Sequence, residues 1–161
     1  MRLFLNLIII FLNFIQIDNS LVLCDIGGFN LLMIKLNTSQ DIDLKTKYAL
    51  VLGSSMQGNP YVKIHALESN ILPLLLNQIA TTNESDKFNN QNFISKLLFS
   101  LSGLLGNFPL AQNRLIQYGG IETLTSIVKN PTYSVKLKAK ALTLVNDMIS
   151  ERVKIILKIH F

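Results

Sequence analysis

Apolar side chains recur along this chain at intervals of three and four residues, which is the spacing of amphipathic helices. One clear stripe consists of Phe29, Leu32, Met33 and Leu36. The same spacing, read together with the breaks between stripes, predicts helices over residues 3–17, 20–26, 28–37, 41–57, 60–68, 71–81, 93–106, 109–118, 121–129 and from about 133 to at least 153. The pattern therefore favours an all-α protein.

Prolines and polar residues mark where these helices begin and end. Asn59-Pro60 and Asn130-Pro131 end helices, because proline lacks an amide donor and restricts the residue before it. Ser39 or Asp41 is expected to cap the helix over 41–57. Residues 82–92 form a polar stretch whose one apolar side chain is Phe88, and they predict a loop.

Two short motifs repeat along the chain with the same spacing. The first occurs as Gly27-Gly28-Phe29, Ser69-Asn70-Ile71 and Gly119-Gly120-Ile121, in steps of 42 and 50 residues counted from the second position. The second begins at Leu44, Ile94 and Leu137, in steps of 50 and 43. One polar insertion near residues 83–92 explains the long step in both series.

A helical repeat of about 40–47 residues is typical of armadillo and HEAT proteins. Each full unit here has a long helix, a proline break, a short helix, a corner of small residues and a third helix. Three helices per unit indicate armadillo rather than HEAT. We therefore predict an armadillo-repeat α-solenoid, a right-handed superhelix of about three repeats over residues 18–153, with a C-terminal tail over 154–161.

Composition agrees with stacked helices and excludes some functions. Hydrophobic residues make up 49% of the chain and charged residues 16%, which suits repeats that bury faces against two neighbours. The net charge of +5 is spread along the chain without a dense basic stripe, which argues against nucleic-acid binding. A single cysteine, Cys24, excludes an intramolecular disulfide and a cysteine-based zinc site.

The N-terminus allows two interpretations. Met1-Arg2 precedes an apolar stretch over residues 3–15, which has the length of a signal-peptide core and is shorter than the roughly 20 residues of a membrane span. Residues 1–17 are therefore either a signal-like segment or a leading solenoid helix. Two N-glycosylation sequons begin at Asn37 and Asn83, both at expected turns, and they would be usable in the secretory pathway.

The chain offers no recognisable catalytic set. Its two histidines are His65, inside a short helix and expected to be structural, and His160 at the end. Residues 53–58 superficially resemble a phosphate loop, but Asn59-Pro60 stands where lysine and serine or threonine are required. Gly53 is instead expected to allow close helix packing, and Gly58 to end a helix. We predict a protein that is not an enzyme and has no cofactor and no metal site.

Several of these segments resemble one family, the armadillo-type nucleotide exchange factors for 70-kDa heat-shock chaperones. The segments are YALVLGSSMQGNP at 48–60 with VKIHALE at 62–68, and FSLSGLLGNFPLAQNRLIQYGG at 99–120. Asp18-Asn19 and residues 23–28 fit the family's opening repeat. Asn59-Pro60 and residues 108–112 resemble the family's ER-lumenal members, which serve the chaperone BiP. The resemblance covers roughly residues 17–153.

The resemblance implies a protein that acts by binding a partner and does not catalyse a reaction itself. Such factors grip one lobe of the chaperone's ATPase domain with a concave surface lined by third helices, and they promote ADP release. The partner is then a BiP-like chaperone, the localisation the ER lumen or alternatively the cytoplasm, and the protein a monomer without a stable membrane span. Outward positions of the third helices are the candidate contacts: Asn30, Lys35, Asn77, Glu122, Ser126 and Lys129.

Family members carry further sequence before and after the repeats, so we expect this chain to be incomplete relative to them. A rival interpretation is an armadillo peptide-binding adaptor without exchange activity. Such adaptors usually display tryptophan and asparagine along their third helices, whereas this chain has no tryptophan. A third interpretation is a structural fragment with no partner of its own.

Overall fold

The computed structural model describes residues 17–85 and 90–160, and this part of the chain is helical with no strand. The all-α prediction is confirmed, and the arrangement is an armadillo-like α-solenoid. The helices are α2 (Ile17–Asp25), α3 (Gly28–Thr38), α4 (Ile42–Met56), α5 (Pro60–Glu68), α6 (Ile71–Ser85), α7 (Gln91–Leu105), α8 (Pro109–Gln117), α9 (Gly120–Lys129) and α10 (Val135–His160).

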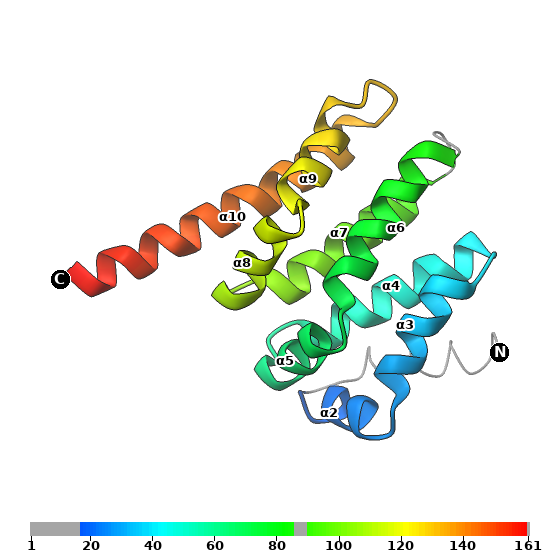
Figure 1. Cartoon of the computed structure of the whole chain (residues 1–161), viewed down its shortest axis with the longest axis horizontal. Coiled ribbons are helices and arrows are strands. Elements are labelled where there is room, and N and C mark those ends of the chain that lie inside the picture. The colour runs from blue at the N-terminus through cyan, green and yellow to red at the C-terminus, as the bar shows by residue number, and fades with distance from the viewer. Residues whose placement is uncertain (1–16, 86–89, 161) are drawn as a thin grey trace.

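The long helices form two layers (Figure 1). In one layer α4, α7 and α10 follow one another, and in the other α3, α6 and α9 do so. The short helices α2, α5 and α8 lie at one end of these layers. One continuous core fills the space between the elements, from Leu23 in α2 to Met148 in α10. Each third helix therefore has one face buried in this core and another free to meet a partner.

The three corners before the third helices share one backbone conformation. Gly27, Asn70 and Gly119 all have left-handed backbone angles, with φ of 72°, 60° and 71°. Glycine and asparagine are the residues that adopt this conformation most readily. By backbone conformation, Asn70 therefore corresponds to Gly27 and Gly119. The sequence motif had paired Asn70 with Gly28 and Gly120, so the structural correspondence is shifted by one residue.

The closest packing in the solenoid is between α4 and α7. A Cβ atom added at Gly103 would lie 2.6 Å from the carbonyl oxygen of Gly53, so the two backbones touch there. Beside this contact, the buried Ser100 hydroxyl donates a hydrogen bond of 2.5 Å to the carbonyl oxygen of Ala49. The expectation that Gly53 allows close helix packing is confirmed. The expectation that Gly58 ends a helix is also confirmed, since Gly58 follows α4 with a φ of 67°.

The proline breaks also hold as expected. Asn59 caps α5 by accepting a hydrogen bond of 3.2 Å from the amide of Val62, and Pro60 occupies the first turn, where its missing amide costs nothing. Pro109 begins α8 in the same way. Asp41, rather than Ser39, is the cap of α4, and its side chain accepts from the amides of Asp43 and Leu44.

Two predicted boundaries differ from the structure. The polar stretch over 83–92 is largely helical at both ends, since α6 continues to Ser85 and α7 begins at Gln91. Thr82 is buried, so the packed face of α6 continues beyond the predicted end at residue 81. Residues 154–160, predicted as a tail, continue α10 because no helix-breaking residue interrupts them. The predicted helix over 3–17 lies outside the described residues except for Ile17, which begins α2.

We predict that Gly103→Ala destabilises the protein. Alanine favours a helix by roughly 0.5–1 kcal/mol over glycine. However, its methyl group would meet a backbone oxygen that cannot rotate away, and overpacking costs about 1–3 kcal/mol. We expect a net loss of about 1–2 kcal/mol in the free energy of unfolding, measured by urea denaturation.

The matched control for this prediction is Ser102→Ala, an exposed position next to Gly103 in the same helix. It should be neutral or slightly stabilising. An unchanged or increased stability of Gly103→Ala would show that α4 and α7 do not depend on close backbone contact.

Candidate functional site

The candidate site is the outer face of α3, α6 and α9, which lie side by side in one layer (Figure 1). Each of these helices turns an apolar stripe inward. In α3 the stripe is Phe29, Leu32, Met33 and Leu36, as predicted. In α9 it includes Leu124 and Ile127, and Ile121 is half-buried. Residues between these stripes face outward because the helix has 3.6 residues per turn.

The structure places most of the predicted contact residues on this face. Five of the six are exposed, and they come from all three helices: Asn30, Asn77, Glu122, Ser126 and Lys129. Lys35 is half-buried, so only part of its side chain is available to a partner. The six residues share a layer without converging on one pocket. Such an arrangement suits a broad protein contact.

Two apolar residues on this face were missed by sequence reasoning. Leu31 and Ile34 in α3 are 45% and 57% exposed. The signal was available, because the stripe of Phe29, Leu32, Met33 and Leu36 leaves both positions on the opposite side of the helix. Polar and charged residues mark an outward face more clearly than apolar ones do, and Leu31 and Ile34 are apolar. Exposed apolar side chains among polar ones are typical of protein-binding surfaces.

The charges on α9 also have a local role. Glu122 lies in the first turn and Lys129 in the last, where each charge complements the helix dipole. Between them the Ser126 hydroxyl donates to the carbonyl oxygen of Thr123 at 2.7 Å. The face is therefore of mixed charge, and it would select a partner by complementary pairs rather than by net attraction.

The sequons lie within helices and not at turns, which corrects the sequence prediction. Asn37 is in the last turn of α3, and Asn83 is near the end of α6. The Asn37 side chain is exposed, and its Oδ1 accepts a hydrogen bond of 3.3 Å from Nε2 of the buried Gln78. This bond links α3 to α6. It uses the oxygen of the Asn37 amide, so the amide nitrogen points away from Gln78.

The histidine, cysteine and acidic side chains of the described residues lie apart from one another. The described residues contain no group of three or more histidine, cysteine or acidic side chains that could hold a metal ion. His65 packs edge-on against Phe29, with ring centroids 5.6 Å apart, which is the structural role expected of it. Burial, followed by the charge of Asp25, raises the pKa of Cys24 to about 11, so its thiol stays protonated and unreactive at neutral pH.

None of the described helices combines the length and the apolar character that a membrane span requires. The long α10 is interrupted by charged residues throughout its length.

Comparisons with known proteins point in one direction. The family model described as the SIL1/FES1/HPBP1 C-terminal domain matches residues 19–159. The chain is 33% identical over 139 residues to the nucleotide exchange factor SIL1 of Mus musculus and 34% identical over 139 residues to Sil1 of Drosophila melanogaster. The SIL1 protein of Xenopus laevis is 33% identical over 137 residues. Each match covers 85% of this chain but only 28–31% of the relative.

We predict that core and face positions of α9 differ sharply in their effect on stability. Leu124 is 1% exposed, so Leu124→Ala should lower the free energy of unfolding by roughly 2–5 kcal/mol. Lys129→Glu, on the exposed face of the same helix, should cost less than about 1 kcal/mol through the helix dipole. Urea denaturation of both variants tests the assignment, and equal losses would contradict it.

Proposed function

This chain belongs to the SIL1/FES1/HPBP1 family, and on that premise we propose that it acts as a nucleotide exchange factor for a 70-kDa heat-shock chaperone of the BiP type. One observation carries the proposal: the match spans almost the whole repeat region, and the relatives that it resembles are named nucleotide exchange factors. These relatives are co-chaperones rather than catalysts of a chemical reaction. An exchange factor needs a binding surface and no catalytic group.

In this proposal the outer face of α3, α6 and α9 binds the chaperone's ATPase domain. Leu31 and Ile34 supply exposed apolar area at one end of the face, and Glu122 and Lys129 supply charges at the other. Asn77 lies on α6 between them. Such a face would hold a lobe of the ATPase domain without reaching the nucleotide itself.

The exchange step is a shift of population. A ligand moves a conformational equilibrium only by its difference in affinity for the two states. A tenfold rise in the open, ADP-releasing state therefore requires that the face bind this state about 1.4 kcal/mol more tightly than the closed state. A few well-packed contacts are enough for that difference. The rigid, close-packed α4–α7 pair would keep the face from adapting equally well to both states.

We propose the ER lumen as the site of action. The support comes from the resemblance to ER-lumenal exchange factors at Asn59-Pro60 and residues 108–112, from the signal-like residues 1–17 and from the two sequons. We also propose that the chain is a monomer, which sedimentation velocity can measure directly.

The test of exchange follows the release of a fluorescent ADP analogue from purified BiP. The wild-type chain should accelerate release. Ile34→Asp should reduce the acceleration at least tenfold, because a carboxylate placed in an apolar contact loses its water without gaining a partner. Ile116→Asp in α8 is the matched control, since Ile116 is 48% exposed and lies outside the third helices.

Circular dichroism establishes that both variants are folded. Equal loss of acceleration in both variants would place the contact elsewhere on the protein. A folded wild-type chain that neither binds BiP nor accelerates release would overturn the proposal, and binding without acceleration would favour the adaptor interpretation.

The localisation has an independent test in N-glycosylation. Expressed in cells with its own N-terminus, the protein should show a glycosidase-sensitive shift in mobility, because the Asn37 side chain is exposed at the surface. Ser39→Ala should remove the Asn37 component of that shift, whereas Ser39→Thr keeps the sequon and should retain it. A protein without any sensitive shift would favour the cytoplasmic alternative.

A further inference from the structure

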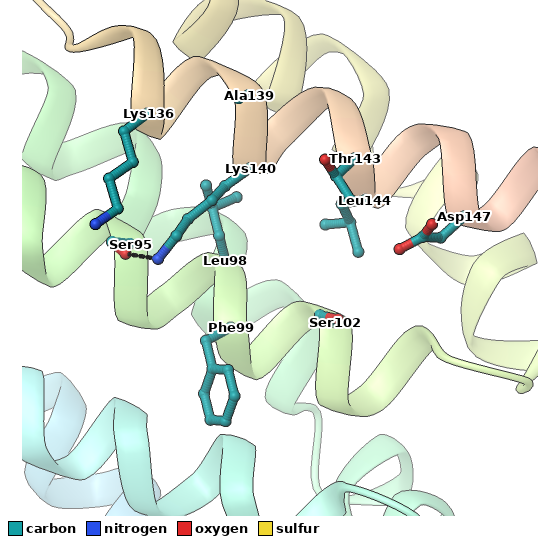
Figure 2. A pocket seen from close by; sticks show the side chains of 10 residues that line it. All are labelled: Ser95, Leu98, Phe99, Ser102, Lys136, Ala139, Lys140, Thr143, Leu144 and Asp147. Carbon is teal, nitrogen blue, oxygen red and sulfur yellow. Dashed lines mark hydrogen bonds between the residues drawn. The ribbon is translucent and has the colours of Figure 1, made fainter.

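The helix α10 packs less closely on α7 than α7 packs on α4. The backbones of α4 and α7 touch at Gly53 and Gly103, whereas α10 carries the exposed Asn146 at the same register. At the register of Ser100, α10 carries Thr143, which lines an open groove of about 400 Å³ between α7 and α10 (Figure 2). The position of α10 must therefore be fixed elsewhere along its length.

The start of α10 is held to α7 only at the protein surface. The floor of the groove between the two helices is apolar and consists of Leu98 and Leu144. At its edge, Figure 2 shows Lys140 donating a hydrogen bond to the hydroxyl oxygen of Ser95. The amide of Ser134, just before α10, donates to Oε1 of Gln91 at 2.9 Å. Both bonds are exposed, so water competes for each partner and the net contribution of each bond is small.

The far half of α10 makes stronger bonds, and they meet at Glu151. One carboxylate oxygen of Glu151 accepts from the backbone amide of Asn107 at 2.8 Å and from Nε2 of Gln112 at 2.6 Å. Gln112 is fully buried, and the same Nε2 also donates to the carbonyl oxygen of Leu105 at 3.0 Å. Hydrogen bonds to an ionised acceptor are roughly twice as strong as neutral ones. Glu151, Asn107 and Gln112 form what we call the Glu151 clamp, which holds α10 against the corner between α7 and α8.

A lysine from the preceding unit reaches the same corner. Lys63 of α5 is 8% exposed, and its ammonium group donates to the carbonyl oxygen of Gly106, the residue before Asn107. Burial lowers the pKa of Lys63, and the negative charge of Glu151 acts in the opposite direction, so the two charges favour each other across the corner. The clamp therefore connects three successive units, through α5, the α7–α8 corner and α10.

The position of α10 in turn determines where α9 lies. The helix α9 packs on α10 and follows α8 through the corner at Gly119. With its 26 residues, α10 is about 39 Å long, so a loosened end would let the whole helix tilt over the open groove. Such a tilt would displace Glu122 and Lys129 of α9 relative to Leu31 and Ile34 of α3, which lie at the other end of the proposed exchange face.

We propose that Glu151 is a positioning residue for the exchange face. Its clamp fixes the tilt of α10 and, through α9, the spacing between the charged and the apolar ends of that face. The effect on ADP release rests on the exchange function proposed above, whereas the effect on the spacing does not. Because one oxygen accepts both bonds, Glu151→Gln keeps an acceptor at this place and Glu151→Ala removes it.

A distance measurement tests the clamp without the chaperone. Cys24→Ser removes the one native cysteine, and spin labels are then attached at Thr38→Cys in α3 and Thr125→Cys in α9, both exposed positions. Double electron–electron resonance should give a narrow distribution of distances between the labels. Glu151→Ala should widen this distribution about twofold or more, because the corner no longer holds α10. Glu151→Gln should give a width close to that of the unmodified clamp.

Release of a fluorescent ADP analogue from purified BiP tests the consequence. Glu151→Ala should reduce the acceleration about fivefold or more, because a displaced α9 lowers the preference of the face for the open state. Glu151→Gln should restore most of the acceleration. Glu68→Ala in α5 is the matched control, since it removes an exposed glutamate outside the clamp and the face, and it should change neither readout. Circular dichroism establishes equal helicity of the variants.

Four results would overturn the positioning role. These are an unchanged distance distribution in Glu151→Ala, equal widening in Glu68→Ala, a Glu151→Gln variant as impaired as Glu151→Ala, and a widened distribution with undiminished exchange. If the wild-type chain itself does not accelerate release, the exchange function falls. The distance measurement then decides by itself whether the clamp fixes the spacing of α3 and α9.

Discussion

The architecture depends on the contact between α4 and α7, where the backbones at Gly53 and Gly103 touch. Any side chain at these positions would separate the two helices, and the core residues that both contribute to the middle repeat would lose their packing. The hydrogen bond from Ser100 to the carbonyl oxygen of Ala49 lies beside this contact and fixes the helices along their length. The helices α6 and α9 are connected to α4 and α7 through the short helices α5 and α8 and tight corners. Their spacing therefore follows from the spacing of the first helices.

The close backbone contact between α4 and α7 has no counterpart between α7 and α10. Asn146 and Thr143 stand in α10 where Gly103 and Ser100 stand in α7, and a groove with an apolar floor opens between α7 and α10. Repeats of the same architecture can thus present different surfaces, because a glycine at the contact lets two helices approach closely and a larger residue does not. The solenoid has a broad mixed face on its third helices and a narrow charged groove on its first helices.

Both surfaces are suited to binding rather than to chemistry. His65 is engaged with Phe29, and the pKa of Cys24 is raised to about 11, so the two side chains with the most catalytic potential among those described serve packing. The exchange factor proposed above would act through differences in affinity between two states of the chaperone. The rigidity of its own core matters more to that action than any reactive group does.

The sequence by itself determined the class of fold, the three-helix unit, the proline breaks and the role of Gly53, because these depend on local periodicity and on backbone preferences of proline and glycine. It also placed Asn30, Asn77, Glu122, Ser126 and Lys129 correctly on the outside. Only the tertiary structure decided the rest. The burial of Thr82 near the end of α6 and the partial burial of Lys35 in α3 are not visible in the periodicity of either helix alone. The groove beside α10 exists because two distant helices fail to meet, and a periodicity within one helix carries no information about the distance to another.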